Sequence, residues 1–125
     1  MSAPPETDKS VPLLFVYGTL KRGLHNHAFL AGQEYVGPAR TLPHYHLYHC
    51  GPYPGLVAAE SGVAVDGELW RVDEETLRRL DDFEGVPAVF DRRLIPLEGR
   101  DESAFVYFYV KAVGAFSRCA AWPPG

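Results

Sequence analysis

One short segment combines residue types that could bind an anion. In Tyr17-Gly18-Thr19-Leu20, a run of apolar β-forming residues stops at a glycine and a hydroxyl. A strand that ends so abruptly leaves several backbone N–H groups without strand partners, and such groups can hold an anion. The alternative is a simple tight turn, in which Gly18 provides conformational freedom and Thr19 bonds its own backbone.

A second candidate is Glu84, a carboxylate near the end of the best expected helix. It lies one turn after Leu80 and two turns after Leu77, which places it on the apolar face of that helix. Burial, the negative end of the helix dipole and the neighbouring charge of Asp81 would each raise its pKa toward that of a general base. The alternative is that Glu84 lies past the last turn and meets only solvent. Asp81 and Asp82 are expected to be ordinary surface or capping acids.

The histidines and cysteines do not predict a metal site. His44 and His46 would share one face of a strand, but no acidic or thiol partner has a matching spacing apart from the nearby Cys50. Cys50 and Cys119 are expected to be free thiols in a reducing compartment, because a disulfide scaffold of this size carries more cysteines. Nothing resembles a Ser-His-Asp elbow, a P-loop or a dinucleotide fingerprint.

Length and charge limit the classes of protein to consider. The 125 residues suit one domain, and a hydrophobic content of 46% is enough for an ordinary packed interior. A net charge of −4 without blocks of like charge argues against nucleic-acid and anionic membrane surfaces as partners. The N-terminus lacks the features of a signal peptide, and no apolar run approaches a membrane span. We therefore expect a soluble cytoplasmic protein. We also expect a monomer, although these features do not determine the oligomeric state.

The chain is organised as one domain dominated by strands. Residues 1–10 are expected to be a flexible tail, 11–116 the domain and 117–125 a C-terminal extension. Strands are expected at 13–17, 34–42, 45–50, 56–59, 67–72, 92–96 and 104–113, with a brief helix at 26–30. This predicts an α+β domain with a barrel-like sheet.

The longest expected helix covers residues 73–83, with Asp73 as its N-cap and Gly85 just past its end. The 104–113 strand is apolar or aromatic on both faces, as expected for a strand covered on both sides. One face carries Phe105, Tyr107 and Tyr109, and the other carries Val106, Phe108 and Val110.

Four segments, in order, carry a family resemblance over roughly residues 13–113. They are Val16–Gly23, Tyr53–Leu56, Val65–Trp70 and Leu80–Gly85. Together they resemble the gamma-glutamylcyclotransferase-like superfamily, and in particular the branch that contains gamma-glutamylamine cyclotransferase and the plant AIG2-like proteins. The resemblance implies a small mixed barrel-like β-sheet with a few short helices, and it implies no metal or cofactor.

The resemblance also implies roles for both candidate segments. Backbone groups of Tyr17, Gly18, Thr19 and Leu20 would hold the gamma-glutamyl head of a small substrate, and Glu84 would be the acid–base residue. The substrate's own α-amine would attack its γ-carbonyl, which releases 5-oxoproline and a free amine. No protein nucleophile is needed for this reaction.

Phe90 departs from the family pattern. Similar proteins often have a tyrosine two residues before an arginine after the catalytic helix, whereas Phe90 precedes Asp91 and Arg92 here. A substrate contact made by that hydroxyl would be lost. Two alternatives therefore stay open: a non-catalytic small-molecule-binding or interaction module on the same fold, and a cyclotransferase that acts on gamma-glutamyl peptides such as glutathione.

Overall fold

The computed structural model describes residues 11–24, 26–50, 53–114 and 116–119, and eight strands within them form one sheet. The strands are β1 (Leu13–Val16), β2 (Glu34–Arg40), β3 (Tyr45–His49), β4 (Pro54–Ala58), β5 (Asp66–Arg71), β6 (Phe90–Ile95), β7 (Ala104–Tyr109) and β8 (Ser117–Cys119). The helices are a 3-10 turn, η2 (His27–Leu30), and α1 (Glu74–Glu84). The expected tail at 1–10 lies outside the described residues, as do Pro52 of the expected turn and residues 120–125.

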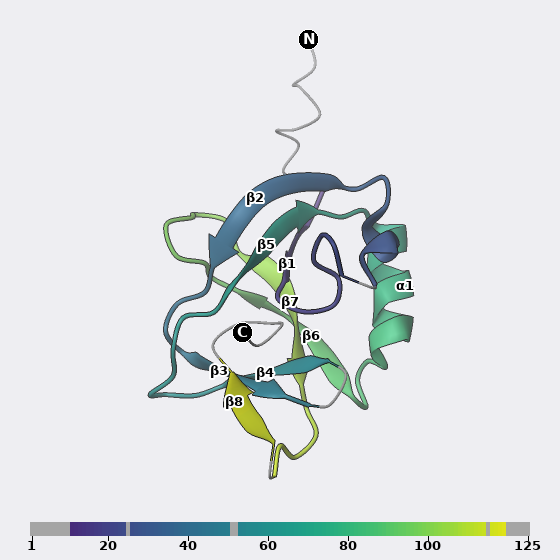
Figure 1. Ribbon diagram of the computed structural model, residues 1–125. Coiled ribbons are helices and arrows are strands. Elements are labelled where there is room, and N and C mark those ends of the chain that lie inside the picture. The colour runs from purple at the N-terminus through teal and green to yellow at the C-terminus, as the bar shows by residue number, and fades with distance from the viewer. Residues whose placement is uncertain (1–10, 25, 51–52, 115, 120–125) are drawn as a thin grey trace.

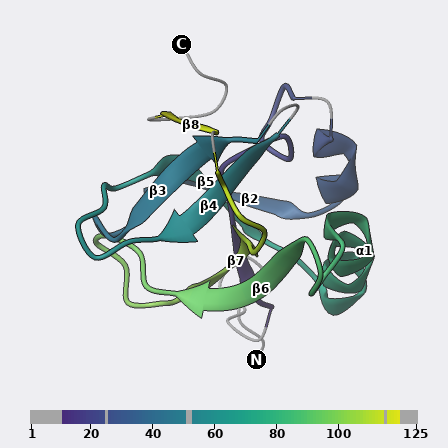
Figure 2. The ribbon, with the colours of Figure 1, turned by 90° about the horizontal axis from the view of Figure 1, so that it is seen from below.

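The sheet is mixed and strongly curved. Its strand order is β2-β5-β1-β7-β4-β3-β8, with β6 paired to β7 beside this path. Strand β7 runs parallel to β1 and β4, whereas the other pairs are antiparallel. Figure 1 shows the strands curled into a half-barrel with α1 on its flank, and Figure 2 shows η2 beside α1 on that same flank. The expected α+β class with a barrel-like sheet is confirmed.

Strands β1 and β4 follow one another along the same edge of β7. Leu14 pairs with Phe105 near the start of β7, and Leu56 pairs with Phe108 further along. Between these pairings, the buried hydroxyl of Tyr17 donates to the carbonyl oxygen of Tyr107 at 2.6 Å and accepts from the N–H of Leu56 at 3.1 Å. One side chain thus satisfies both backbone groups at the point where β1 leaves the sheet.

The two faces of the sheet belong to two different cores. Alternate residues of β1 and β7 fill the inside of the half-barrel, and the residues between them pack on the side of α1. The expected division of β7 is confirmed, with Val106 and Phe108 inside and Phe105, Tyr107 and Tyr109 on the helix side. Val110 lies beyond the end of β7 and is exposed. Covering both faces explains why β1 carries no charged residue.

The boundaries of α1 follow the expected capping residues. Asp73 caps the N-terminus by accepting a 2.8 Å hydrogen bond from the N–H of Thr76. Gly85 ends the helix with a φ of 70°, a left-handed conformation that glycine adopts without steric cost. Leu77 and Leu80 are buried against the sheet. The helix register is therefore fixed at both ends and along its apolar face.

Strand β8 was not expected from the sequence. It pairs antiparallel with β3, so part of the expected C-terminal extension belongs to the sheet. Three residues are too short to show a strand periodicity, which explains the miss. Cys50 is buried, and the side chain of Cys119 lies outside what the structure describes. Across the described ranges, neither helix has the length and apolar character needed to cross a membrane.

Candidate active site

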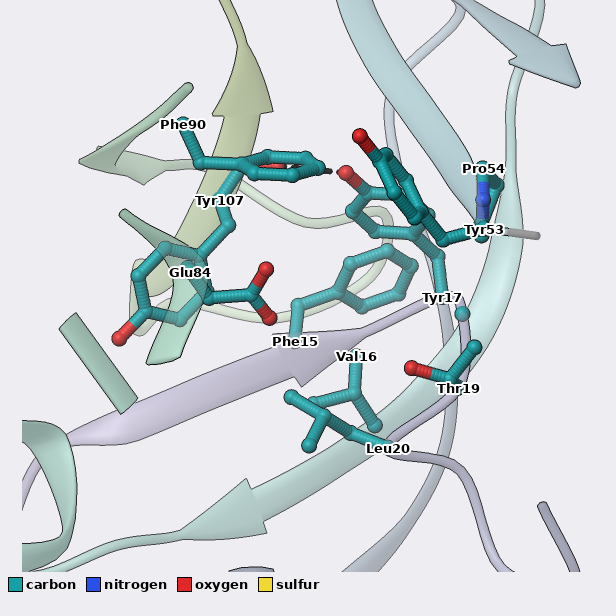
Figure 3. A pocket seen from close by; sticks show the side chains of 11 residues that line it. Phe15, Val16, Tyr17, Thr19, Leu20, Tyr53, Pro54, Glu84, Phe90 and Tyr107 are labelled. Atoms are coloured by element: carbon teal, nitrogen blue, oxygen red, sulfur yellow. Dashed lines mark hydrogen bonds between the residues drawn. The ribbon is translucent and has the colours of Figure 1, made fainter. Parts of the chain in front are cut away.

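A pocket lies where the end of β1 meets the C-terminal end of α1 (Figure 3). Its cavity volume is about 40 Å³. It is lined by Phe15, Val16, Tyr17, Gly18, Thr19, Leu20, Tyr53, Pro54, Glu84, Phe90 and Tyr107. Both segments singled out in the sequence, Tyr17–Leu20 and Glu84, therefore line one pocket.

The segment after β1 is a tight turn whose backbone donors have few partners. The N–H of Lys21 donates to the carbonyl oxygen of Gly18 at 3.1 Å, which closes the turn. The N–H groups of Gly18, Thr19 and Leu20 donate to no other group in the described part of the chain. Three donors in sequence at one pocket wall form the kind of concave backbone surface that binds an anion.

The reason for a glycine at position 18 is space. A Cβ atom on Gly18 would lie only 2.8 Å from Cγ of Pro54, so the β4 segment can approach only because no side chain is present. The Thr19 hydroxyl contacts Asn26, whose Nδ2 donates a 2.8 Å hydrogen bond to Oγ1. The turn of the tight-turn interpretation is present, and the close approach of Pro54 gives a further reason for glycine at position 18.

Tyr17 and Arg22 contribute less to the pocket than their side chains suggest. The hydroxyl of Tyr17 is committed to the sheet junction, and burial raises its pKa far above the usual range of a phenol. Arg22 points elsewhere: its Nε lies 3.4 Å from Oε2 of Glu68, and its guanidinium lies 3.9 Å from the ring centre of Tyr35. Neither side chain is left to bind a substrate anion.

Glu84 points into the pocket rather than into solvent. In Figure 3 its carboxylate and the hydroxyl of Thr19 point into the same space from opposite sides. Burial raises the pKa of Glu84 from 4.5 to about 7. The expectation of an inward, perturbed carboxylate is confirmed. The expected contribution from Asp81 is not found, because burial alone causes the shift.

Asp81 is not the ordinary surface acid that the sequence suggested. Arg92 contacts both of its oxygens, at 2.8 and 3.0 Å, and the Tyr107 hydroxyl donates to Oδ1 at 2.8 Å. Burial on its own would raise the pKa of Asp81, but these hydrogen bonds and the charge of Arg92 outweigh it and lower the pKa. The pKa values of two carboxylates on adjacent turns of α1 are thus shifted in opposite directions: that of Asp81 is lowered and that of Glu84 is raised.

A second compartment continues outward from Glu84. Its cavity volume is about 300 Å³, and its lining includes Thr19, Tyr53, Glu84 and Phe90 from the first pocket. The remaining lining residues are Asn26, Phe83, Gly85 and Val89. Phe90, the departure from the family pattern, therefore lines both spaces, and it is almost fully buried. The sequence alone does not reveal this compartment, because its walls come from three separate segments of the chain.

The described residues bring no three histidine, cysteine, aspartate or glutamate side chains together as metal ligands. The wall of the pocket is mainly apolar, and its ionisable groups are one carboxylate and phenols. The site as described therefore offers proton transfer and backbone anion binding.

The half-barrel and its pocket place the protein in a known class. The family model for gamma-glutamyl cyclotransferase, AIG2-like, matches residues 14–122, and the chain belongs to this family of enzymes. A Vibrio cholerae protein provisionally named a gamma-glutamylcyclotransferase is 44% identical over 97 residues, covering 78% of this chain and 81% of that protein.

Two mammalian proteins extend this comparison. Human gamma-glutamylaminecyclotransferase is 41% identical over 100 residues, which cover 74% of this chain and 65% of the human protein. The crystal structure of an AIG2-like protein from Mus musculus superposes with a TM-score of 0.78 at 30% identity, covering 89% of this chain and 87% of that one. The fold and the family thus agree.

Proposed function

We propose that this protein is a cofactor-independent gamma-glutamyl cyclotransferase that releases 5-oxoproline and a free amine from a small gamma-glutamyl amine. The observation that carries the proposal is the pairing of two features in one pocket. Glu84 supplies a carboxylate with a pKa of about 7, and the turn at Gly18–Leu20 supplies backbone donors. The family membership and the name of the human relative support the same activity.

The turn holds the substrate's α-carboxylate in this proposal. Gly18, Thr19 and Leu20 line the pocket, and their N–H groups have no partner among the described residues, so a carboxylate bound there would satisfy them. Holding that end of the glutamyl chain brings the α-nitrogen near the γ-carbonyl. Orientation of this kind can contribute several kcal/mol to a ring closure, on the order of 7–11 kcal/mol in the most favourable cases.

Glu84 moves the protons. It accepts a proton from the α-ammonium of the substrate, the freed nitrogen attacks the γ-carbon, and a five-membered lactam forms. The bond from the γ-carbon to the leaving nitrogen then breaks as that nitrogen is protonated from Glu84. In total the α-nitrogen loses two protons and the leaving nitrogen gains two, so charge balances and no water is consumed. A carboxyl group with a pKa near the working pH serves both transfers.

The test is release of 5-oxoproline by the purified protein from a panel of substrates. The panel contains gamma-glutamyl-ε-lysine, gamma-glutamyl alkylamides and glutathione, the last of which represents the peptide alternative. Glu84→Gln is expected to lose about 10²–10⁴-fold in kcat, the usual range for an acid–base group. Glu75→Gln, an exposed glutamate at the start of the same helix, is the matched control and keeps full activity.

The outcomes separate the proposal from its alternatives. Turnover of glutathione in preference to the amines would shift the substrate class to gamma-glutamyl peptides. Substrate binding without 5-oxoproline release by the wild-type protein would favour a non-catalytic binding module. A Glu84→Gln variant with full activity would rule out the assigned role of that residue.

A further inference from the structure

Three aromatic side chains line the outer compartment: Tyr53, Phe83 and Phe90. Phe90 packs against Tyr53, with ring centres 5.7 Å apart, and against Tyr109 at 5.4 Å. The Phe83 ring lies 4.4 Å from that of Phe29, yet 45% of Phe83 remains exposed. An aromatic ring that is half-exposed at the mouth of a cavity is available for contact with a ligand.

The same compartment lacks cations. Among its described lining residues, Glu84 is the one carboxylate and none is an arginine or lysine. The amide nitrogen of Asn26 is already donating to Thr19. Arg92, on the strand that begins at Phe90, is bound to Asp81 through two contacts. A carboxylate on a ligand in this space would therefore find no cationic partner among the described lining residues.

Because Glu84 lines both the inner pocket and the outer compartment, its position indicates which part of the substrate occupies the outer compartment. The leaving nitrogen must lie within reach of Glu84 to be protonated, and Glu84 lines both compartments. In the proposed function the turn at Gly18–Leu20 in the inner pocket holds the glutamyl head, so the chain beyond the leaving nitrogen extends into the outer compartment, whose cavity volume is about 300 Å³.

We propose that the outer compartment selects leaving amines with an uncharged apolar chain, such as alkylamines and arylalkylamines, over amines that carry a carboxylate and an ammonium. This inference rests on the cyclotransferase activity proposed above. Apolar chains gain from burial against Phe83, Val89 and Phe90. A zwitterionic chain loses hydration in the same space without gaining partners, and its ammonium competes for the Glu84 carboxylate that the reaction needs.

Two substrates of matched length test the selection. Gamma-glutamyl-n-pentylamide has the same carbon chain as gamma-glutamyl-ε-lysine and lacks its carboxylate and α-amino group. We expect kcat/KM to be about tenfold or more higher for the pentylamide, because burying unpaired charge is costly. Equal or better turnover of the lysine derivative overturns the selection. No 5-oxoproline from any substrate, gamma-glutamyl methylamide and glutathione included, would instead refute the proposed function.

Variants of Phe83 test whether the leaving amine binds in the outer compartment. Phe83→Ala is expected to lower the ratio of kcat/KM for the pentylamide to that for the methylamide by about fivefold, because it removes one aromatic wall. Phe116→Ala, at a phenylalanine of similar exposure outside both pockets, is the matched control and keeps the wild-type ratio.

A second variant uses charge instead of truncation. Phe83→Lys places a cation at the mouth of the compartment and is expected to shift preference toward gamma-glutamyl-ε-lysine, whose carboxylate it can pair with. Thermal melts verify that each variant is folded. If both Phe83 variants keep the wild-type substrate ratios, the leaving amine does not occupy this compartment and the inference is wrong.

Discussion

The hydroxyl of Tyr107 donates a 2.8 Å hydrogen bond to Oδ1 of Asp81, and this bond ties α1 to the central strand of the sheet. Arg92 on β6 adds two further contacts to the same carboxylate. Asp81 lies one turn before Glu84, so these three hydrogen bonds fix the last turn of the helix against β6 and β7. We therefore expect these contacts to set the direction of the Glu84 carboxylate, and we regard Asp81 as a positioning residue.

Asp81→Asn is therefore expected to affect turnover more than substrate binding. The variant leaves Arg92 without a charged partner in a half-buried site, which should cost about 1–3 kcal/mol of stability. We expect kcat to fall about tenfold with KM within about threefold of wild type, because Glu84 shifts while the turn at Gly18 does not. Urea denaturation and steady-state kinetics measure both effects.

Asp82→Asn provides the control for this change. Asp82 is the next residue on α1 and is exposed. Its substitution should change the free energy of unfolding by less than about 0.5 kcal/mol and kcat by less than about twofold relative to wild type. If the two variants behave alike, the contacts of Asp81 do not position Glu84.

The pH dependence of kcat/KM should report the titration of Glu84. The base form must be present in the free enzyme, so activity is expected to rise with pH and to level off above an apparent pKa of about 7. An ordinary exposed glutamate would give a limb near 4.5 instead. Rate profiles measured with two substrates whose α-ammonium groups titrate differently show whether the limb belongs to the enzyme. A limb that moves with the substrate contradicts the assignment.

Stability should depend on pH in the opposite sense. The folded protein holds the Glu84 proton up to a pKa of about 7, whereas the unfolded chain releases it near 4.5. Stability from this group is fully present below 4.5 and is lost as pH rises through 7. Glu84→Gln cannot ionise, so its stability relative to wild type should increase by about 1–3 kcal/mol between pH 5 and pH 8. Urea denaturation at both pH values measures this, and a pH-independent difference would mean that the carboxylate is solvated.

The parts of the site that sequence predicted are those governed by local geometry. Helical periodicity from Leu77 and Leu80 placed Glu84 on the buried face, and the abrupt end of an apolar run located the turn at Gly18. The parts it missed depend on how distant segments pack. The partners of Asp81 come from β6 and β7, and the reason for Gly18 is the ring of Pro54 on β4. No spacing along the chain encodes such contacts.

The same limit applies to the sheet. The alternation of side chains in β7 predicted which residues face the interior. A strand has a period of two residues, and the six residues of β7 are enough to show that period. Strand β8 has three residues, and its pairing with β3 is decided by tertiary contacts rather than by its own pattern. The junction between β1 and β4 was likewise invisible, because it depends on one hydroxyl that two distant backbones share.

Tyr17→Phe tests that junction directly. Removing the hydroxyl leaves the N–H of Leu56 and one hydrogen bond of the Tyr107 carbonyl unsatisfied in a fully buried place. We expect a loss of about 2–4 kcal/mol in the free energy of unfolding, since an unpaired buried polar group costs about 1–3 kcal/mol. Tyr48→Phe on β3, a tyrosine that is only half-buried, should cost less than about 0.5 kcal/mol. Urea denaturation of both variants decides the matter: if Tyr17→Phe is no less stable than Tyr48→Phe, water replaces the hydroxyl and the half-barrel does not depend on it.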